Sequence, residues 1–484
     1  MQRARCVWRL SSHHPRELPD EGYNRWSSRG VDVYEEDRCF FISSYGLPTR
    51  WQIEQTAAAA AVPLAAVDAE VEIRLSNPLN SLPLADLCGA NTNVVIVCDR
   101  APLDEARLAI LRGVLSHLER AGIAPHRVTL LIAAMDDEMP NSAEPLHGVH
   151  TALNGLGEYA NCIHIAQHDP EDVRELDDMG SFEGVPLTIN YRAAEADLLI
   201  AIYLMQLGDD ACCAGSCATI TLGVVGAPAR RELRTTRFYD DRIEPSALDL
   251  PLFQRVVREG ARRAGLMFAV GALVDAKGHP LAVYAGAPIN VDDALADAAR
   301  ALQECDVDAP SYDVVLAEPN RSGRAGGSLF DAGLAAIHIS LARTPILRRG
   351  GSLILPIGRR DDDGASARAF YNALTNAPSP ESVIRQLRGR SLQTGEARAY
   401  LLAHAMQRHR VIAAGPQCEQ LARDIHFLSS SSVREAAELA ENFTGKHPRA
   451  LIVRHALSTT PVFRGKLFTH DAFDAPELVA PRWN

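Results

Sequence analysis

Short, uninterrupted apolar runs alternate with helical segments along most of this chain. The run at 94–98 contains only Val, Ile and Cys, and a second run follows at 128–133. Between them, Leu108, Leu111 and Leu115 fall on one stripe of a helix. A strand that is apolar on both faces is typical of a parallel sheet covered by helices. The pattern therefore predicts an α/β fold built from right-handed βαβ units with mostly parallel sheets.

The chain is long enough for two domains. The turn at Lys277-Gly278 predicts a β-hairpin, which we expect to open the second domain. We expect an irregular extension at 1–48, an N-terminal α/β domain at 49–265, a C-terminal α/β domain at 266–462 and a tail at 463–484. Further buried strands are expected at 196–202, 267–274, 281–284, 313–317, 352–357, 411–414 and 450–453, and a helix at 292–304.

Composition excludes several classes of function. A net charge of −12 argues against a nucleic-acid partner, which would require a basic face. No apolar stretch approaches the length of a membrane span, and the basic N-terminus is not followed by the apolar core of a secretory signal. The ten cysteines of such a chain are expected to be reduced thiols. We expect a cytoplasmic protein, whose oligomeric state no feature of the sequence fixes.

Ligands of open α/β sheets bind at the carboxyl ends of the strands. The loops that follow the predicted strands here start at Asp99, Asp136, Tyr203, Glu318 and Gly358. We therefore expect a site formed by these loops, in a cleft between the two halves of the chain.

Several segments resemble those of the nickel-pincer lactate racemases, in the order of that family and across residues 70–462. The family's Asn-Pro segment before the first core strand is similar to Asn77-Pro78, and its glycine loop ends as Gly223-Val224-Val225-Gly226 does here. Further similar segments lie at 185–198, 284–286, 350–354 and 377–381.

The resemblance implies a racemase or epimerase of a 2-hydroxy acid, and hence a small carboxylate as partner. In that family a nickel-pincer nucleotide is tethered to a lysine, a histidine ligates the nickel, and two further histidines act as bases on opposite faces of the substrate carbon. Histidine suits that role because its pKa lies near neutrality.

This chain departs from the family at those positions. Ala218 stands at the tethering lysine, Gly208 at the second base and Arg234 near the nickel-binding histidine, and the loop at 134–140 has no histidine for the first base. Alanine cannot form the tether, and a protonated arginine is a poor nickel ligand. We therefore expect no pincer nucleotide. Asp99, Arg100 and Arg234 are the candidates for binding the substrate: Asp99 and Arg100 stand in the loop whose arginine grips the carboxylate in the family, and Arg234 belongs to a basic run that could meet a carboxylate.

Three cysteines, Cys212, Cys213 and Cys217, stand just before the tether position. They are candidate ligands of a soft metal, and Cys217 is also a candidate nucleophile. A helix that begins near Ala218 would lower the pKa of a nearby thiol through its dipole. The alternative is that these cysteines are small core residues where backbones pack closely.

Two further sets of residues are candidate catalytic groups. Asp136 and Asp137 follow a predicted strand and would serve as bases or bind a cation, or else form a solvated loop. His168 is a candidate acid or base, although its segment resembles a region of the family where the histidine is structural.

Three functions stay open at this point. The first is an enzyme of the lactate racemase fold that acts on a small carboxylate by altered chemistry. The second is a non-catalytic relative that binds a metabolite or a protein partner, and the third is a working nickel-dependent racemase.

Overall fold

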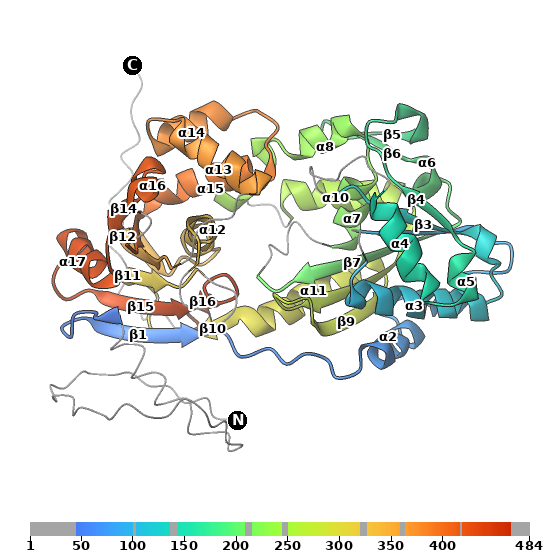
Figure 1. Cartoon of the computed structure of the whole chain (residues 1–484), viewed down its shortest axis with the longest axis horizontal. Coiled ribbons are helices and arrows are strands. Elements are labelled where there is room, and N and C mark those ends of the chain that lie inside the picture. The colour runs from blue at the N-terminus through green and yellow to red at the C-terminus, as the bar shows by residue number, and fades with distance from the viewer. Residues whose placement is uncertain are drawn as a thin grey trace.

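The computed structural model describes residues 45–99, 103–135, 144–208, 215–243, 250–319, 327–358, 364–416 and 419–465. Two lobes make up the molecule, each built on a central sheet with helices on its faces (Figure 1). The predicted α/β class with mostly parallel sheets is thereby confirmed. Within these ranges, no helix has both the length and the apolar character needed to cross a membrane.

The first sheet has six strands in the order β4-β3-β2-β7-β8-β9. Neighbouring strands run parallel except β9, which is antiparallel to β8. Its strands are β2 (Val94–Cys98), β3 (Val128–Ile132), β4 (His164–Gln167), β7 (Leu198–Gln206), β8 (Leu266–Val274) and β9 (Pro280–Gly286). The helices of this half are α2 (Val67–Ser76), α3 (Glu105–Arg120), α4 (Glu144–Asn154), α5 (Glu158–Asn161), α6 (Tyr191–Ala194), α7 (Ser216–Gly223), α8 (Ala227–Leu233), α10 (Leu252–Arg263) and α11 (Pro288–Gln303).

The sequence of β2 and α3 explains their structure directly. All five residues of β2 are buried, because helices cover both faces of the sheet at this strand. The helix α3 begins where the Asp104 side chain accepts a hydrogen bond from the Arg107 N–H at 2.9 Å. Its apolar stripe, with Leu111 and Val114, is buried against the sheet. The βαβ unit expected at 94–133 is therefore present.

The hairpin β8–β9 lies in a different place from the one expected. Its two strands were expected to open the second domain, and this expectation is wrong, because β8 pairs with β7 and so extends the first sheet. The helix α11 packs against the same hairpin. The hydrophobic pattern located the hairpin correctly but carries no information on which sheet the hairpin joins.

The second sheet is parallel throughout, in the order β1-β15-β11-β12-β13-β14. Its strands are β1 (Gln52–Ala57), β11 (Tyr312–Ala317), β12 (Leu347–Pro356), β13 (Arg410–Ala414), β14 (Leu428–Ser430) and β15 (Arg449–Arg454). The helices are α12 (Leu329–Ser340), α13 (Ala365–Thr375), α14 (Pro380–Leu387), α15 (Thr394–Arg408), α16 (Glu419–Asp424) and α17 (Val433–Thr444). Two small sheets, β5 (Leu176–Phe182) with β6 (Val185–Asn190) and β10 (Glu304–Asp306) with β16 (Thr460–Val462), complete the described strands.

The strand β1 comes early in the chain but belongs to the sheet of the second half. It precedes the whole first sheet in sequence, yet it pairs with β15, with Gln52 opposite Arg449 (Figure 1). Trp51, just before β1, is buried in the core of the second half. The expected extension at 1–48 lies mostly outside the described residues, apart from 45–48.

The strand order reverses once in each sheet. In the first, β2, β3 and β4 follow one another in one direction, and β7 lies on the other side of β2. In the second, β11 to β14 run in one direction, and β15 lies on the other side of β11. Ligands of open α/β sheets bind outside the carboxyl ends of the strands at such a switch point. The arrows of β1 and β7 point toward each other in Figure 1, so the carboxyl edges of the two sheets face one another.

Residues 234–243, which include α9 (Asp240–Ile243), join the two halves. The Arg234 carbonyl accepts a hydrogen bond from the Leu392 N–H at 3.0 Å, and the Thr236 hydroxyl accepts one from the Gly389 N–H at 3.0 Å. Farther along, the Tyr400 hydroxyl donates to Asp240 at 3.1 Å. This segment fixes the region after α8 against the second half.

Candidate functional site

The first switch point, between β2 and β7, is occupied by an internal ion pair. Asp99 directly follows β2, and its two oxygens accept hydrogen bonds from Arg107 Nε and Nη2 at 2.6 and 2.8 Å. The Leu204 N–H of β7 donates to the same carboxylate at 3.2 Å. Arg107 also pairs with Asp104, and its side chain is only 8% exposed. The charge of Asp99 is therefore already neutralised by its own βα unit.

A second carboxylate accepts hydrogen bonds at the N-terminus of α7. Asp292, on α11, accepts hydrogen bonds from the Ser216 N–H at 2.7 Å, the Cys217 N–H at 3.4 Å and the Tyr203 hydroxyl at 2.6 Å. Gly215 leaves room for it, because a Cβ there would lie 2.9 Å from Asp292 Oδ2. The free N–H groups at the start of a helix attract an anion. In this protein the anion is a side chain of the chain itself.

Burial sets the protonation of the groups around α7. Burial, and after it the negative charge of Asp292, raise the pKa of the Cys217 thiol to about 12. The same burial raises the pKa of Asp292, against the hydrogen bonds from Tyr203 and Ser216 that lower it. The expectation that the helix dipole lowers the pKa of this thiol is wrong for Cys217, because the thiol is buried and lies beside the Asp292 carboxylate. The helix does begin near Ala218, at Ser216.

Of the three candidate cysteines, only Cys217 belongs to the described residues. Cys212 and Cys213 lie outside the described residues, and Cys217 is 4% exposed. In the parts of the chain that the structure describes, no group of three or more His, Cys, Asp or Glu side chains is arranged to hold a metal ion. The soft-metal site stays a prediction, whereas Cys217 itself is a protonated core thiol.

His168 is held by protein groups on both ring nitrogens. Nε2 donates to the Val225 carbonyl at 2.9 Å, and Nδ1 accepts from the Asn190 side-chain amide at 3.2 Å. The residue is 2% exposed, and burial lowers the pKa of its imidazole. The ring is therefore neutral and joins β6 to the segment after α7.

Arg234 lies where the first half meets the second. It ends α8, and its Nη2 is 3.5 Å from the Met135 carbonyl, just beyond the carboxyl end of β3. Its own carbonyl binds the second half through Leu392. The guanidinium is thus placed at Met135, the last described residue before Asp136 and Asp137 in the sequence. Those two residues and Arg100 lie outside the described residues.

The second switch point, between β11 and β15, is also lined by polar side chains. Glu318 directly follows β11 and is 4% exposed, and its Oε1 accepts a hydrogen bond from the Tyr45 hydroxyl at 2.9 Å. Burial raises the pKa of Glu318, while the Tyr45 hydroxyl, the charge of Arg454 and the His455 N–H lower it. His455 directly follows β15, and its φ of 50° lies in the left-handed region. The sequence marked the Glu318 loop, but nothing local to it indicated Tyr45 or His455 as neighbours.

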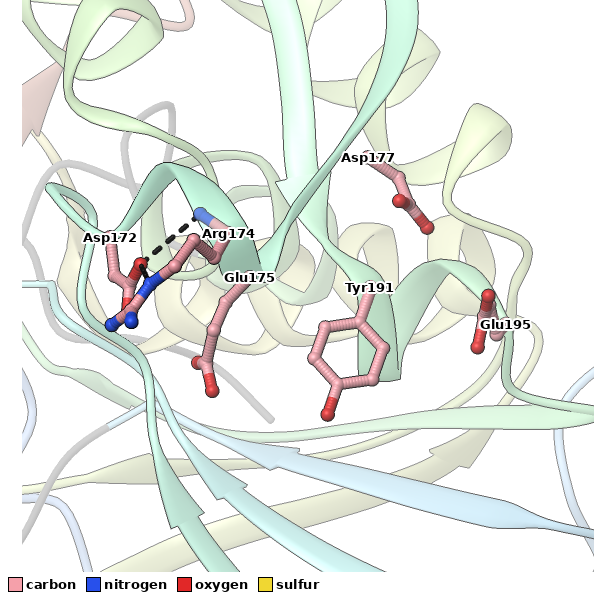
Figure 2. A pocket seen from close by; sticks show the side chains of 6 residues that line it. All are labelled: Asp172, Arg174, Glu175, Asp177, Tyr191 and Glu195. Atoms are coloured by element: carbon pink, nitrogen blue, oxygen red, sulfur yellow. Dashed lines mark hydrogen bonds and ion pairs between the residues drawn. The ribbon is translucent and has the colours of Figure 1, made fainter.

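A surface depression of about 500 Å³ lies apart from these strand ends, on the first half (Figure 2). It is lined by Asp172, Arg174, Glu175, Asp177, Tyr191 and Glu195. Arg174 turns toward Asp172, at 2.7 Å, and Glu175 pairs with Arg192 at 2.8 Å, which leaves Asp177 and Glu195 to set the charge. An anionic substrate would be repelled here, so we do not place the carboxylate site in this depression.

Comparisons with known proteins agree with the architecture. Residues 42–207 match the family model of the lactate racemase N-terminal domain. The fold is similar to that of the lactate racemase apoprotein from Thermoanaerobacterium thermosaccharolyticum, with a TM-score of 0.67, 18% identity, and 87% of this chain and 96% of that one covered. A structural-genomics protein from Thermotoga maritima also matches, with a TM-score of 0.52, 12% identity, and 84% and 100% covered. The search of curated proteins gave no significant match.

The residues present do not fit the nickel-pincer nucleotide that the resemblance implies. Ala218, at the tether position, is 2% exposed and carries no amine. Beside it, Asp292 fills the helix terminus that would accept a phosphate. Arg234, near the nickel-ligand position, is a cation whose nitrogen faces a carbonyl oxygen.

Proposed function

We propose that this protein acts on a small 2-hydroxy acid at the junction of its two halves, without a pincer nucleotide. The match of residues 42–207 to the lactate racemase N-terminal domain and the likeness of the fold to that of a lactate racemase apoprotein support the proposal. The observation that carries the proposal is the carboxylate of Asp292 at the N-terminus of α7. A nucleotide phosphate at that terminus would meet a negative charge instead of free N–H groups.

Arg234 supports the carboxylate part of the proposal. A guanidinium binds a carboxylate with two parallel hydrogen bonds, and Arg234 lies between the carboxyl end of β3 and the second half. Asp99 is less suited to contact a substrate, because Arg107 already neutralises it. Arg100, Asp136 and Asp137 stay candidates from the neighbouring loops.

The cofactor part is tested by intact-protein mass spectrometry. The protein is produced together with the enzymes that make the pincer nucleotide, and the expected mass is that of the unmodified chain. A mass increment equal to that of the nucleotide would refute the proposal and favour a nickel-dependent racemase.

The substrate part is tested by titration calorimetry with D-lactate, L-lactate and glycolate. Arg234→Ala is expected to weaken binding by about tenfold or more, since hydrogen bonds to charged groups are worth roughly 1.5–3 kcal/mol. Arg231→Ala is the matched control, because this side chain of the same helix is 63% exposed and pairs only loosely with Glu171, at 3.3 Å. Equal affinities of the two variants would contradict the role of Arg234.

A second candidate function is a non-catalytic protein that binds the same ligand. This function is favoured because Cys217 and His168 are both buried, and because His168 already forms a hydrogen bond with the Val225 carbonyl. Chiral chromatography of lactate after incubation with the protein separates the two candidates. Binding without any change in the substrate would favour the non-catalytic protein.

A further inference from the structure

The end of α8 is held by the second half of the molecule, through residues 388–392 in the connection between α14 and α15. Thr235 pairs with Ser391 of this segment as an antiparallel bridge. Next to that pair, the Leu392 N–H donates to the Arg234 carbonyl at 3.0 Å. The backbone of Arg234 is therefore positioned by the second half.

One side chain completes this contact. Thr236 is 4% exposed, and its hydroxyl accepts a hydrogen bond from the Gly389 N–H at 3.0 Å. Gly389 adopts a φ of 76°, in the left-handed region that glycine takes without strain, so the turn after α14 depends on this residue. Thr236 thus supplies a side-chain acceptor to a turn whose backbone belongs to the other half.

The side chain of Arg234, by contrast, is directed at the first half. Its Nη2 lies 3.5 Å from the Met135 carbonyl, just beyond the carboxyl end of β3. Met135 packs against Gly223, since a Cβ added there would lie 3.1 Å from the Met135 Sδ. Arg234 is therefore held at its backbone by one half and at its guanidinium by the other. A side chain that is already positioned loses less conformational entropy when a ligand binds to it, and this raises the affinity.

We propose that Thr236 is a positioning residue of the carboxylate site. The hydrogen bond that it accepts from Gly389 fixes the backbone from which the Arg234 guanidinium reaches the ligand. The inference rests on the proposed function, in which Arg234 binds the carboxylate of a 2-hydroxy acid. The second half of the molecule thereby contributes to the binding of a ligand by a residue of the first half.

The test measures the affinity for glycolate by titration calorimetry on the full chain. Thr236→Val keeps the shape of the side chain but removes the acceptor, and it is expected to weaken binding by about threefold to tenfold. Thr236→Ser keeps the hydroxyl and is expected to bind glycolate as the wild type does. Thr221→Val is the matched control, because the buried Thr221 hydroxyl donates to the Val257 carbonyl at 2.8 Å within the first half. It loses a hydrogen bond of the core and is expected to keep the wild-type affinity.

A double-mutant cycle shows whether Thr236 acts through Arg234. In the Arg234→Ala background, Thr236→Val is expected to weaken binding no further, because the group that Thr236 positions is gone. An equal loss of affinity in both backgrounds would refute the positioning role, since it would show that Thr236 acts on binding by another route.

The same measurements separate this inference from the proposed function. If the wild-type protein does not bind glycolate, or if Arg234→Ala binds it as tightly as the wild type, the proposed function fails and this inference fails with it. If Arg234→Ala loses affinity while Thr236→Val does not, only the role of Thr236 is refuted. If Thr236→Val does not fold, Thr236→Ala carries the same test, because it removes the acceptor without placing a methyl group against the Gly389 N–H.

Discussion

Replacing Glu441 by Gln tests the contact that holds the start of β1 against α17. The Glu441 side chain is 1% exposed and accepts hydrogen bonds from Arg50, from Trp51 Nε1 at 2.9 Å and from Lys446 Nζ at 3.1 Å. Burial alone would raise the pKa of this carboxyl, but the three donors lower it to about 2. Glutamine keeps the size of the side chain and removes its charge.

The expected loss of unfolding free energy follows from the shift in the pKa of Glu441. Moving a pKa from 4.5 to about 2 corresponds to about 3 kcal/mol at most, at 1.36 kcal/mol per unit. Arg50 and Lys446 are 42% and 71% exposed, and solvent screens their attraction. We therefore expect Glu441→Gln to lower the free energy of unfolding by about 1–2 kcal/mol at pH 7.

The pH dependence of this difference has a definite sign. Because the pKa of Glu441 is lower in the folded than in the unfolded protein, its stabilisation is complete above pH 4.5 and is lost as the pH falls toward 2. The difference in unfolding free energy between the wild type and Glu441→Gln is measured by urea unfolding, followed by tryptophan fluorescence, at pH 7 and near pH 3.5. Glu438→Gln, at an exposed ion pair of α17, is the control. A difference that does not shrink on acidification would show that the charge of Glu441 does not stabilise the fold.

Three further predictions concern the environment of α7 and one close contact of the second half. Asp292→Ala leaves buried donors at the start of α7 without an acceptor and is expected to cost about 2–4 kcal/mol of unfolding free energy, against about 1 for Asp292→Asn, as urea unfolding would show. Iodoacetamide should label the exposed Cys162 quickly and Cys217 very slowly at pH 8, because the pKa of Cys217 is about 12; comparable rates read by peptide mass spectrometry would contradict this. Gly327→Ala should lower the melting temperature, since its Cβ would lie 1.9 Å from the Pro319 carbonyl oxygen, and an unchanged melting temperature would contradict that close contact.

The sequence predicted those strands whose pattern is local. β2 has the predicted ends because its five residues are all apolar and both its faces are covered. β1 was not predicted, since Gln52–Ala57 is a mostly polar segment at the edge of its sheet. Its partner β15 lies almost 400 residues away in the chain, and no local signal indicates such a pairing.

The candidate site was predictable only as a set of loops. The pKa of Cys217 is raised by burial and by Asp292, a residue on another helix, and neither is visible in the local sequence, which therefore suggested a reactive thiol near a helix terminus. The same holds for Tyr45, which reaches Glu318 only because β1 joins the second sheet. A strand end can be located from a pattern, whereas the partner of a charged group depends on tertiary packing.

The two switch points differ in how their acidic residue is held. In each sheet an acidic residue directly follows the central strand: Asp99 after β2 and Glu318 after β11. Asp99 receives two hydrogen bonds from Arg107, so its charge is neutralised within its own βα unit. Glu318 accepts a hydrogen bond from the Tyr45 hydroxyl, which comes from the segment before β1. The carboxylate at the first sheet is thus held by a residue of its own βα unit, whereas the one at the second sheet is held by a residue that β1 brings from a distant part of the chain.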